Sequence, residues 1–134
     1  LPTDVHTPHD PYHPESKLFP PHNVRGTWGR AFYGSLAPWY DAHQAEDHVN
    51  MFDKTRYSAF AGTPLDLRLR ERKIATVHLV GVCTDICVLH TAVDAYNLNY
   101  QIVVHQKAVA ALTPAGQDWA LDHFAHVLGA TVID

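Results

Sequence analysis

The chain has 134 residues, of which 46% are apolar, and its formal net charge at pH 7 is −4. This length suits one domain with a real core, and the lack of a basic stripe argues against a nucleic-acid partner. The sequence has no apolar run that would span a membrane. Its two cysteines are too few for a disulfide framework, so a cytoplasmic location is expected.

The first 48 residues are predicted to be largely irregular, because they hold most of the nine prolines and three glycines. Long ordered loops are uncommon inside a domain and are usually functional. Residues 1–6 have the pattern expected at the carboxyl end of a strand. We therefore expect an N-terminally incomplete domain, preceded by a βαβ unit of roughly 30 residues or more.

From residue 49 onward, strand and helix patterns alternate. A short strand is expected at 49–52 and an amphipathic helix at 65–73. The apolar run at 75–82 indicates a buried parallel strand, and 84–97 has helical spacing. The remaining predicted elements are a strand at 100–105, a helix at 114–128 closed by Gly129, and a strand at 130–133. This order predicts an α/β domain over residues 1–134, with three layers and a mostly parallel sheet flanked by helices.

Cys87 lies where the predicted strand at 75–82 passes into a helix. Thr84 is a good N-cap and would place Cys87 at the third helical position. There the unpaired N–H groups and the helix dipole lower the pKa of a thiol and can hold an oxyanion. A buried structural cysteine is an alternative of equal weight. The three-residue gap between Cys83 and Cys87 favours neither a zinc pair nor a thiol redox motif.

Lys54 is a candidate catalytic residue, and four further side chains are candidate metal ligands. Lys54 follows the strand at 49–52, where its charge would favour a neighbouring Cys87 thiolate, although a solvated lysine is the commoner case. Asp4 and His6 face the same way on an extended segment. With two more side chains they form a candidate ligand set for zinc, manganese or iron, consisting of Asp4, His6, Glu15 and His22. Because the chain has eleven histidines, chance clustering is the alternative, and the nearby His9, Asp10 and His13 are set aside.

These stretches together resemble the isochorismatase-like cysteine hydrolases, and within them the nicotinamidases. The resemblance follows the family's order over nearly the whole chain. It rests on Asp4-x-His6, residues 13–22, Gly26-Thr27, residues 54–60, residues 81–88, and Thr91-Ala92-x-Asp94-Ala95.

The resemblance implies roles for individual residues. Cys87 would be the nucleophile and Lys54 the catalytic lysine. The backbone N–H groups of Cys83 and Cys87 would form the oxyanion hole, with a cis peptide between Val82 and Cys83. The metal ligands would be Asp4, His6, Glu15 and His22, and the substrate pocket would include Phe19, Tyr57, Val82 and Cys83.

The sequence departs from the family pattern in two places. The family's catalytic aspartate ends a strand that precedes Leu1, so none of these 134 residues matches it. Cys83 stands where the family usually has a small or aliphatic residue. A second thiol so close to the nucleophile is either harmless lining or an oxidation liability.

The predicted function is metal-dependent hydrolysis of nicotinamide to nicotinic acid and ammonia, through a Cys87 thioester, in NAD salvage. Three alternatives remain open. These are hydrolysis of another small amide or N-carbamoyl compound, a non-catalytic fragment that binds metal and a pyridine, and a thiol redox protein. The expected cofactor is one divalent ion, zinc before manganese or iron. The expected partner is a small-molecule substrate, with a homo-oligomer left open.

Overall fold

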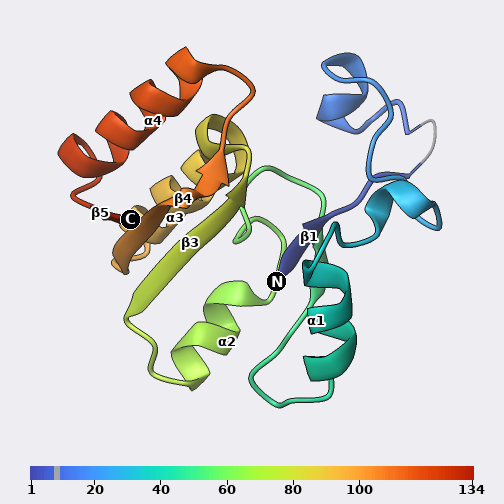
Figure 1. Ribbon diagram of the computed structural model, residues 1–134, viewed down its shortest axis with the longest axis horizontal. Helices are drawn as coiled ribbons and strands as arrows, with labels where there is room; N and C mark the ends of the chain where they lie inside the picture. Colours follow the sequence, from blue (N-terminus) through green and yellow to red (C-terminus); the bar gives the residue numbers. More distant parts are fainter. Residues whose placement is uncertain (8–9) are drawn as a thin grey trace. The chain divides into compact units, whose positions relative to one another are not determined.

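A computed structural model describes residues 1–7 and 10–134 (Figure 1). His9, one of the histidines set aside above, lies outside the described residues. The chain forms two units, Leu1–Thr55 and Arg56–Asp134. Within the part of the chain that is described, no helix is both long and apolar enough to cross a membrane.

The second unit is built on a parallel sheet in the order β3-β4-β5. Its strands are β3 (Thr76–Val82), β4 (Gln101–Ala110) and β5 (Thr131–Ile133), rich in the β-branched residues that favour strands. The helices α3 (Leu89–Asn97) and α4 (Pro114–His126) lie alongside this sheet (Figure 1). The predicted α/β class, with parallel strands and flanking helices, is confirmed.

Alternation along β4 places the core of this unit. Ile102 and Val104 are buried side by side on one face, where they meet Ala92 of α3 and Phe124 of α4. Each of these four side chains is at most 5% exposed. The whole cluster comprises Val88, Ala92, Ala95, Tyr100, Ile102, Val104, Val109, Ala120, Phe124 and Ala130. This packing holds the carboxyl end of β3, and the turn after it, in one defined position.

The helix α2 (Leu65–Glu71) is fastened to this core at its surface. The Tyr100 hydroxyl donates to Asp66 Oδ1 at 2.7 Å, and Arg70 Nε donates to the same oxygen at 3.1 Å. The Arg70 guanidinium also lies 4.7 Å from the centre of the Tyr100 ring.

In the described residues of the first unit there are two short strands, β1 (Pro2–Asp4) and β2 (Phe52–Lys54), which pair in parallel. Between them lie the 3₁₀ turns η1 (Pro14–Lys17) and η2 (Trp28–Arg30) and the helix α1 (Leu36–His43). Asp4 is the register partner of Lys54, so the ends of both strands lie side by side.

The expected burial of the strand at 75–82 was wrong: no residue of β3 is buried, because β3 is the edge strand of its sheet. The strand expected at 100–105 continues to Ala110 as β4, because its end pairs with Gly81 and Val82 beyond an irregularity in register.

Three further local predictions were wrong. The strand expected at 49–52 is β2 at Phe52–Lys54, because pairing with β1 selects its register. The helix α1 falls in the stretch predicted to be irregular. None of its residues is buried, although Leu36, Trp39 and Tyr40 have helical spacing, so the proline and glycine content of the stretch outweighed a signal that the sequence contains.

The third concerns the start of the helix expected at 84–97. It is a π-type turn, η3 (Thr84–Val88), followed by α3. Cys83 occupies the N-cap position and Thr84 the first position of the turn. Thr84 does not cap because its hydroxyl is bound to Gln117 of α4.

Candidate active site and metal centre

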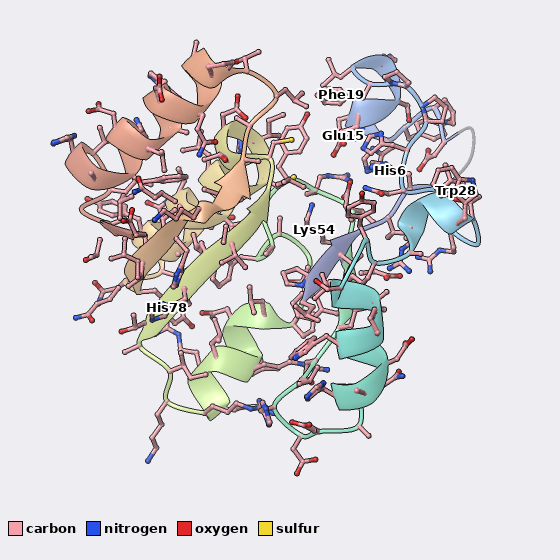
Figure 2. The ribbon with its side chains drawn as sticks, viewed as in Figure 1. His6, Glu15, Phe19, Trp28, Lys54 and His78 are labelled. Carbon is pink, nitrogen blue, oxygen red and sulfur yellow. The ribbon has the colours of Figure 1, made fainter. Side chains whose placement is uncertain are left out.

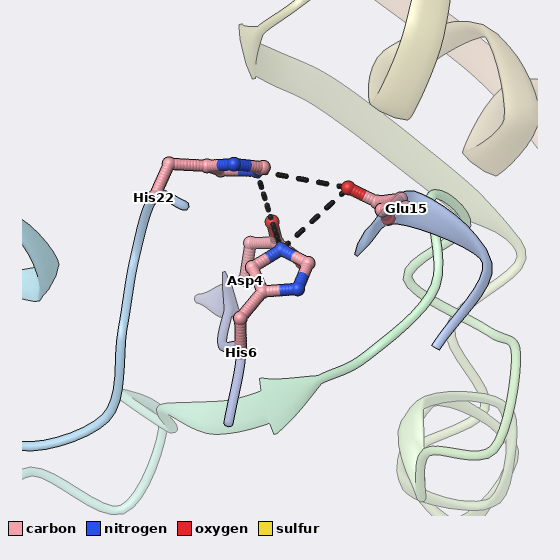
Figure 3. A group of neighbouring side chains, drawn as sticks. All are labelled: Asp4, His6, Glu15 and His22. Carbon is pink, nitrogen blue, oxygen red and sulfur yellow. Dashed lines mark hydrogen bonds and ion pairs between the residues drawn. The ribbon is translucent and has the colours of Figure 1, made fainter. Parts of the chain in front are cut away.

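Four side chains of the first unit converge on one point (Figure 3). His6 Nε2 lies 3.0 Å from Asp4 Oδ2 and 3.5 Å from Glu15 Oε2. His22 Nε2 lies 3.6 Å from each of the same two oxygens. All four candidate ligand atoms are within 4.8 Å of one another, so the predicted set Asp4, His6, Glu15 and His22 is brought together.

Local structure explains this convergence. Asp4 ends β1, and His6 follows two residues later on extended backbone, so both side chains point the same way. The backbone of His6 pairs with the loop that carries His22: its N–H donates to Asn23 O at 3.1 Å, and its carbonyl accepts from Arg25 N at 2.9 Å. Glu15 is delivered by η1 and is 6% exposed.

His13, which was set aside in the sequence analysis, supports this group through hydrogen bonds to the backbone around it. It is 9% exposed, and its Nε2 donates to Thr55 O at 2.7 Å. Its Nδ1 accepts from Glu15 N at 3.2 Å, so the ring caps the turn that presents Glu15. The signal available in the sequence was its place directly before a proline and two residues before an acidic ligand.

The ring of His22 is oriented for metal binding. Its Nδ1 donates to Pro20 O at 2.8 Å, and its Nε2 faces the two carboxylates. A backbone carbonyl that fixes the ring in this way is the usual outer partner of a metal-bound histidine. The ring of Phe19 stands edge-on to it, with centroids 6.1 Å apart, and lies in the same part of the first unit (Figure 2).

Lys54 is 6% exposed, and its Nζ donates to Asp4 Oδ1 at 3.2 Å. Burial by itself raises the pKa of the Asp4 carboxyl. The charge of Lys54 and hydrogen bonds from Lys54 and His6 outweigh that effect, and the pKa lies below its usual value. Asp4 is therefore an anion at neutral pH, as a metal ligand must be.

The donor set fits a divalent cation. Two imidazole nitrogens and two carboxylates match zinc, manganese or iron sites. Asp4 and Glu15 approach the same two nitrogens, and Glu15 is almost fully buried. Placing two carboxylates this close together is costly unless a positive charge lies between them.

The second unit contains the candidate nucleophile. Cys87 lies in η3, one strand-to-helix turn beyond β3, and both cysteines are partly buried. The Val82–Cys83 peptide is cis, as the resemblance implied. The carbonyl of Cys83 accepts from Ile86 N and Val88 N, each at 3.1 Å, which fixes the start of the turn.

The surroundings of Cys83 keep its thiol protonated. Burial, and then the negative charge of Asp85, raise the pKa of the Cys83 thiol. Cys83 is therefore a neutral thiol at pH 7. A neutral thiol is a poor nucleophile and is slow to oxidise, which favours the lining role over the oxidation liability.

Thr91 anchors the backbone of Cys87. Its hydroxyl donates to Cys87 O at 2.7 Å and accepts from Ala59 N at 2.9 Å. Thr91 therefore ties residues 56–60 to the turn that carries Cys87. In that segment the ring of Tyr57 lies 5.2 Å from that of His90. The sequence motif included Thr91, but nothing in the sequence indicated its hydrogen-bond partners.

The predicted site residues are divided between the two units. Lys54 and Phe19 belong to the first unit, which also carries the four candidate metal ligands, called the metal group below. Cys83, Cys87 and Tyr57 belong to the second, as does Val82, which is 68% exposed. The meeting of these residues in one pocket stays a prediction.

A family model, the Isochorismatase domain, matches residues 2–134. The chain belongs to the isochorismatase family. One relative is the uncharacterized isochorismatase family protein PncA of Bacillus subtilis (strain 168). It is 58% identical to this chain over 134 residues. That match covers all of this chain and 73% of the relative.

Solved structures of the isochorismatase family agree. The nicotinamidase/pyrazinamidase PncA from Bacillus subtilis superposes with a TM-score of 0.98 at 57% identity, over 100% of this chain and 73% of that one. The pyrazinamidase/nicotinamidase of Streptococcus mutans UA159 gives a TM-score of 0.96 at 57% identity, over 98% and 73%. The predicted resemblance to the nicotinamidases is thus confirmed, and the chain is nicotinamidase-like.

Proposed function

We propose that the protein containing this chain hydrolyses nicotinamide to nicotinic acid and ammonia and thereby serves NAD salvage. The observation that carries the proposal is the convergence of Asp4, His6, Glu15 and His22 in a chain of nicotinamidase-like sequence and fold. The ring nitrogen of nicotinamide would bind an ion held by these four residues, whereas an N-carbamoyl group offers no such nitrogen.

Asp4, His6, Glu15 and His22 would hold the ion, which we expect to be zinc before manganese or iron. When bound, it would supply a Lewis-acid contact that orients the pyridine ring of the substrate. Lys54 holds Asp4 in its ionised form, and Phe19, beside His22, offers a flat apolar wall for the ring.

The covalent chemistry would belong to the second unit. The Cys87 thiolate attacks the amide carbon, and a sulfur–carbon bond forms. The oxyanion rests on the N–H groups of Cys83 and Cys87. The carbon–nitrogen bond then breaks and the nitrogen leaves as ammonia, which gives a thioester. Water cleaves that thioester, which releases nicotinic acid and restores the thiol.

Proton transfer would need two charged groups. Lys54 would favour the thiolate through its positive charge. The base that accepts the thiol proton would be the aspartate of the family pattern, which none of these 134 residues matches, and it would then give that proton to the leaving nitrogen. Cys83 would not compete for the substrate, because its raised pKa keeps it protonated.

The test compares wild type with Cys87→Ala in the protein that contains this chain, with zinc supplied. Ammonia and nicotinic acid should form together from nicotinamide in the wild type and fall to the uncatalysed rate in the variant. Metal content and thermal unfolding, measured on the same samples, show whether the variant is intact. Undiminished ammonia release by Cys87→Ala would sink the mechanism. Faster turnover of an N-carbamoyl compound than of nicotinamide would sink the substrate assignment.

A further inference from the structure

We propose that Gln117 is a positioning residue for the catalytic turn, acting through the hydroxyl of Thr84. The proposal rests on the proposed function, since it assumes that the Cys83 and Cys87 amides hold an oxyanion. Gln117 lies 33 residues from Thr84 along the chain, on a helix that contributes no residue to the predicted site.

One side-chain amide joins three segments of the second unit. Gln117 Oε1 accepts from Thr84 Oγ1 at 2.7 Å and from Ala111 N at 3.0 Å. Its Nε2 donates to Val109 O at 3.4 Å. The amide thus bridges η3, the end of β4 and the first turns of α4, and all three of its contacts have the correct donor and acceptor sense.

Thr84 is where this bridge acts on the site. It is 0% exposed and directly follows Cys83, whose N–H is one proposed oxyanion donor. Without the Gln117 oxygen, the Thr84 hydroxyl would be buried with no acceptor at this position, which is destabilising. The turn would then rearrange to reach another acceptor and carry the Cys83 peptide with it.

The neighbouring residue of α4 shows that helix and turn are closely fitted. A Cβ on Gly116 would lie 2.4 Å from Asp85 Oδ2 and 3.2 Å from Asp85 Cγ, so no larger residue fits there unless the carboxylate moves. Two consecutive residues of α4, Gly116 and Gln117, therefore meet Asp85 and Thr84, two consecutive residues of η3. This contact between α4 and η3 therefore fixes the position of the turn as well as filling the space between the two elements.

This placement matters because an oxyanion hole works only when its donors are already in position. A shift of about 1 Å can cost on the order of 100-fold in rate even when the altered residue is remote from the reacting atoms. The oxyanion develops in the transition state, so the loss should appear in kcat and leave KM nearly unchanged.

Two substitutions separate this role from a structural one. Gln117→Met keeps the size of the side chain and removes the hydrogen bonds, so kcat should fall roughly 10- to 100-fold with little change in KM. Gln117→Glu keeps both accepted bonds and loses only the donated one, so most of the rate should return. In a double-mutant cycle, adding Thr84→Val to Gln117→Met should cost less than Thr84→Val costs in wild type.

A readout that does not depend on turnover completes the test. The rate at which iodoacetamide alkylates Cys87, followed by mass spectrometry, should change in Gln117→Met and recover in Gln117→Glu. If wild type alkylates at Cys87 but releases no ammonia from nicotinamide, the proposed function fails while the alkylation comparison still decides the role of Gln117. Wild-type kcat and alkylation in Gln117→Met, or additive losses in the cycle, would overturn the positioning role.

Discussion

The two units are stabilised by different means. In the second unit, ten buried side chains form one apolar cluster between a parallel sheet and two helices. Among the described residues of the first unit, Val5 is the one apolar side chain that is buried. The other buried side chains there are His13, Glu15 and Lys54, all in or beside the metal group. The turn that carries the candidate nucleophile thus depends on apolar packing, whereas the candidate ligand group depends on hydrogen bonds and charge.

The largest expected effect tests the apolar side of this contrast. Phe124 is the largest fully buried side chain, so Phe124→Ala should lower the free energy of unfolding by about 3–5 kcal/mol. Urea denaturation measures the change. Tyr33→Ala, at a side chain 95% exposed, is the matched control and should stay within about 0.5 kcal/mol of wild type. An equal loss in both variants would contradict the assignment of the core.

The next effect tests the polar side. A metal at 100 times its dissociation constant stabilises its site by about 2.7 kcal/mol, so chelation should loosen the first unit. Hydrogen exchange should then speed up at the amides of His6 and Arg25, whose bonds join the ligand loops. The amide of Val104 in β4 serves as the internal control and should be unaffected. Uniform acceleration in both units would show that the metal does not act locally.

A smaller effect concerns the outer support of Glu15. His13→Asn keeps an acceptor for Glu15 N, and His13→Gln keeps a donor for Thr55 O. We expect each to weaken zinc binding by about tenfold, and His13→Ala by about 100-fold. Competition with a zinc-binding dye measures the affinity. His48→Ala, at a histidine whose side chain is 80% exposed, is the control. Wild-type affinity in His13→Ala would refute the supporting role.

The smallest effect is at the surface of the second unit. The Tyr100 hydrogen bond, opposed by desolvation and aided by Arg70, lowers the pKa of Asp66. A carboxyl with a folded pKa below its unfolded value stabilises the fold above the unfolded pKa, about 3.9 for Asp. That stabilisation is lost as pH falls through the folded value. Tyr100→Phe should therefore be less stable than wild type at pH 7, with a smaller difference at pH 3 by urea unfolding. A difference independent of pH would contradict this.

Much of the molecule could be predicted from local pattern. The apolar run of β3, the helix α4 ended before Gly129 and the Asp4-x-His6 pair all follow from periodicity and short spacings. Ligand-type side chains had already nominated Glu15 and His22, and the family resemblance added the cis peptide before Cys83; the structure brings the four candidate ligands together and has the cis peptide.

Tertiary structure decided what depends on partners far away in the chain. The register of β2 was set by β1, and the π-type turn at Thr84 was accompanied by a hydrogen bond to Gln117. His13 became a support for Glu15 because the carbonyl of Thr55, 42 residues later, accepts a hydrogen bond from its Nε2. Periodicity reports which face of an element is buried, and it carries no information about the polar atom a side chain will meet there. The sequence by itself therefore determined most of the elements and nominated the candidate reacting groups, and packing determined what holds them in place.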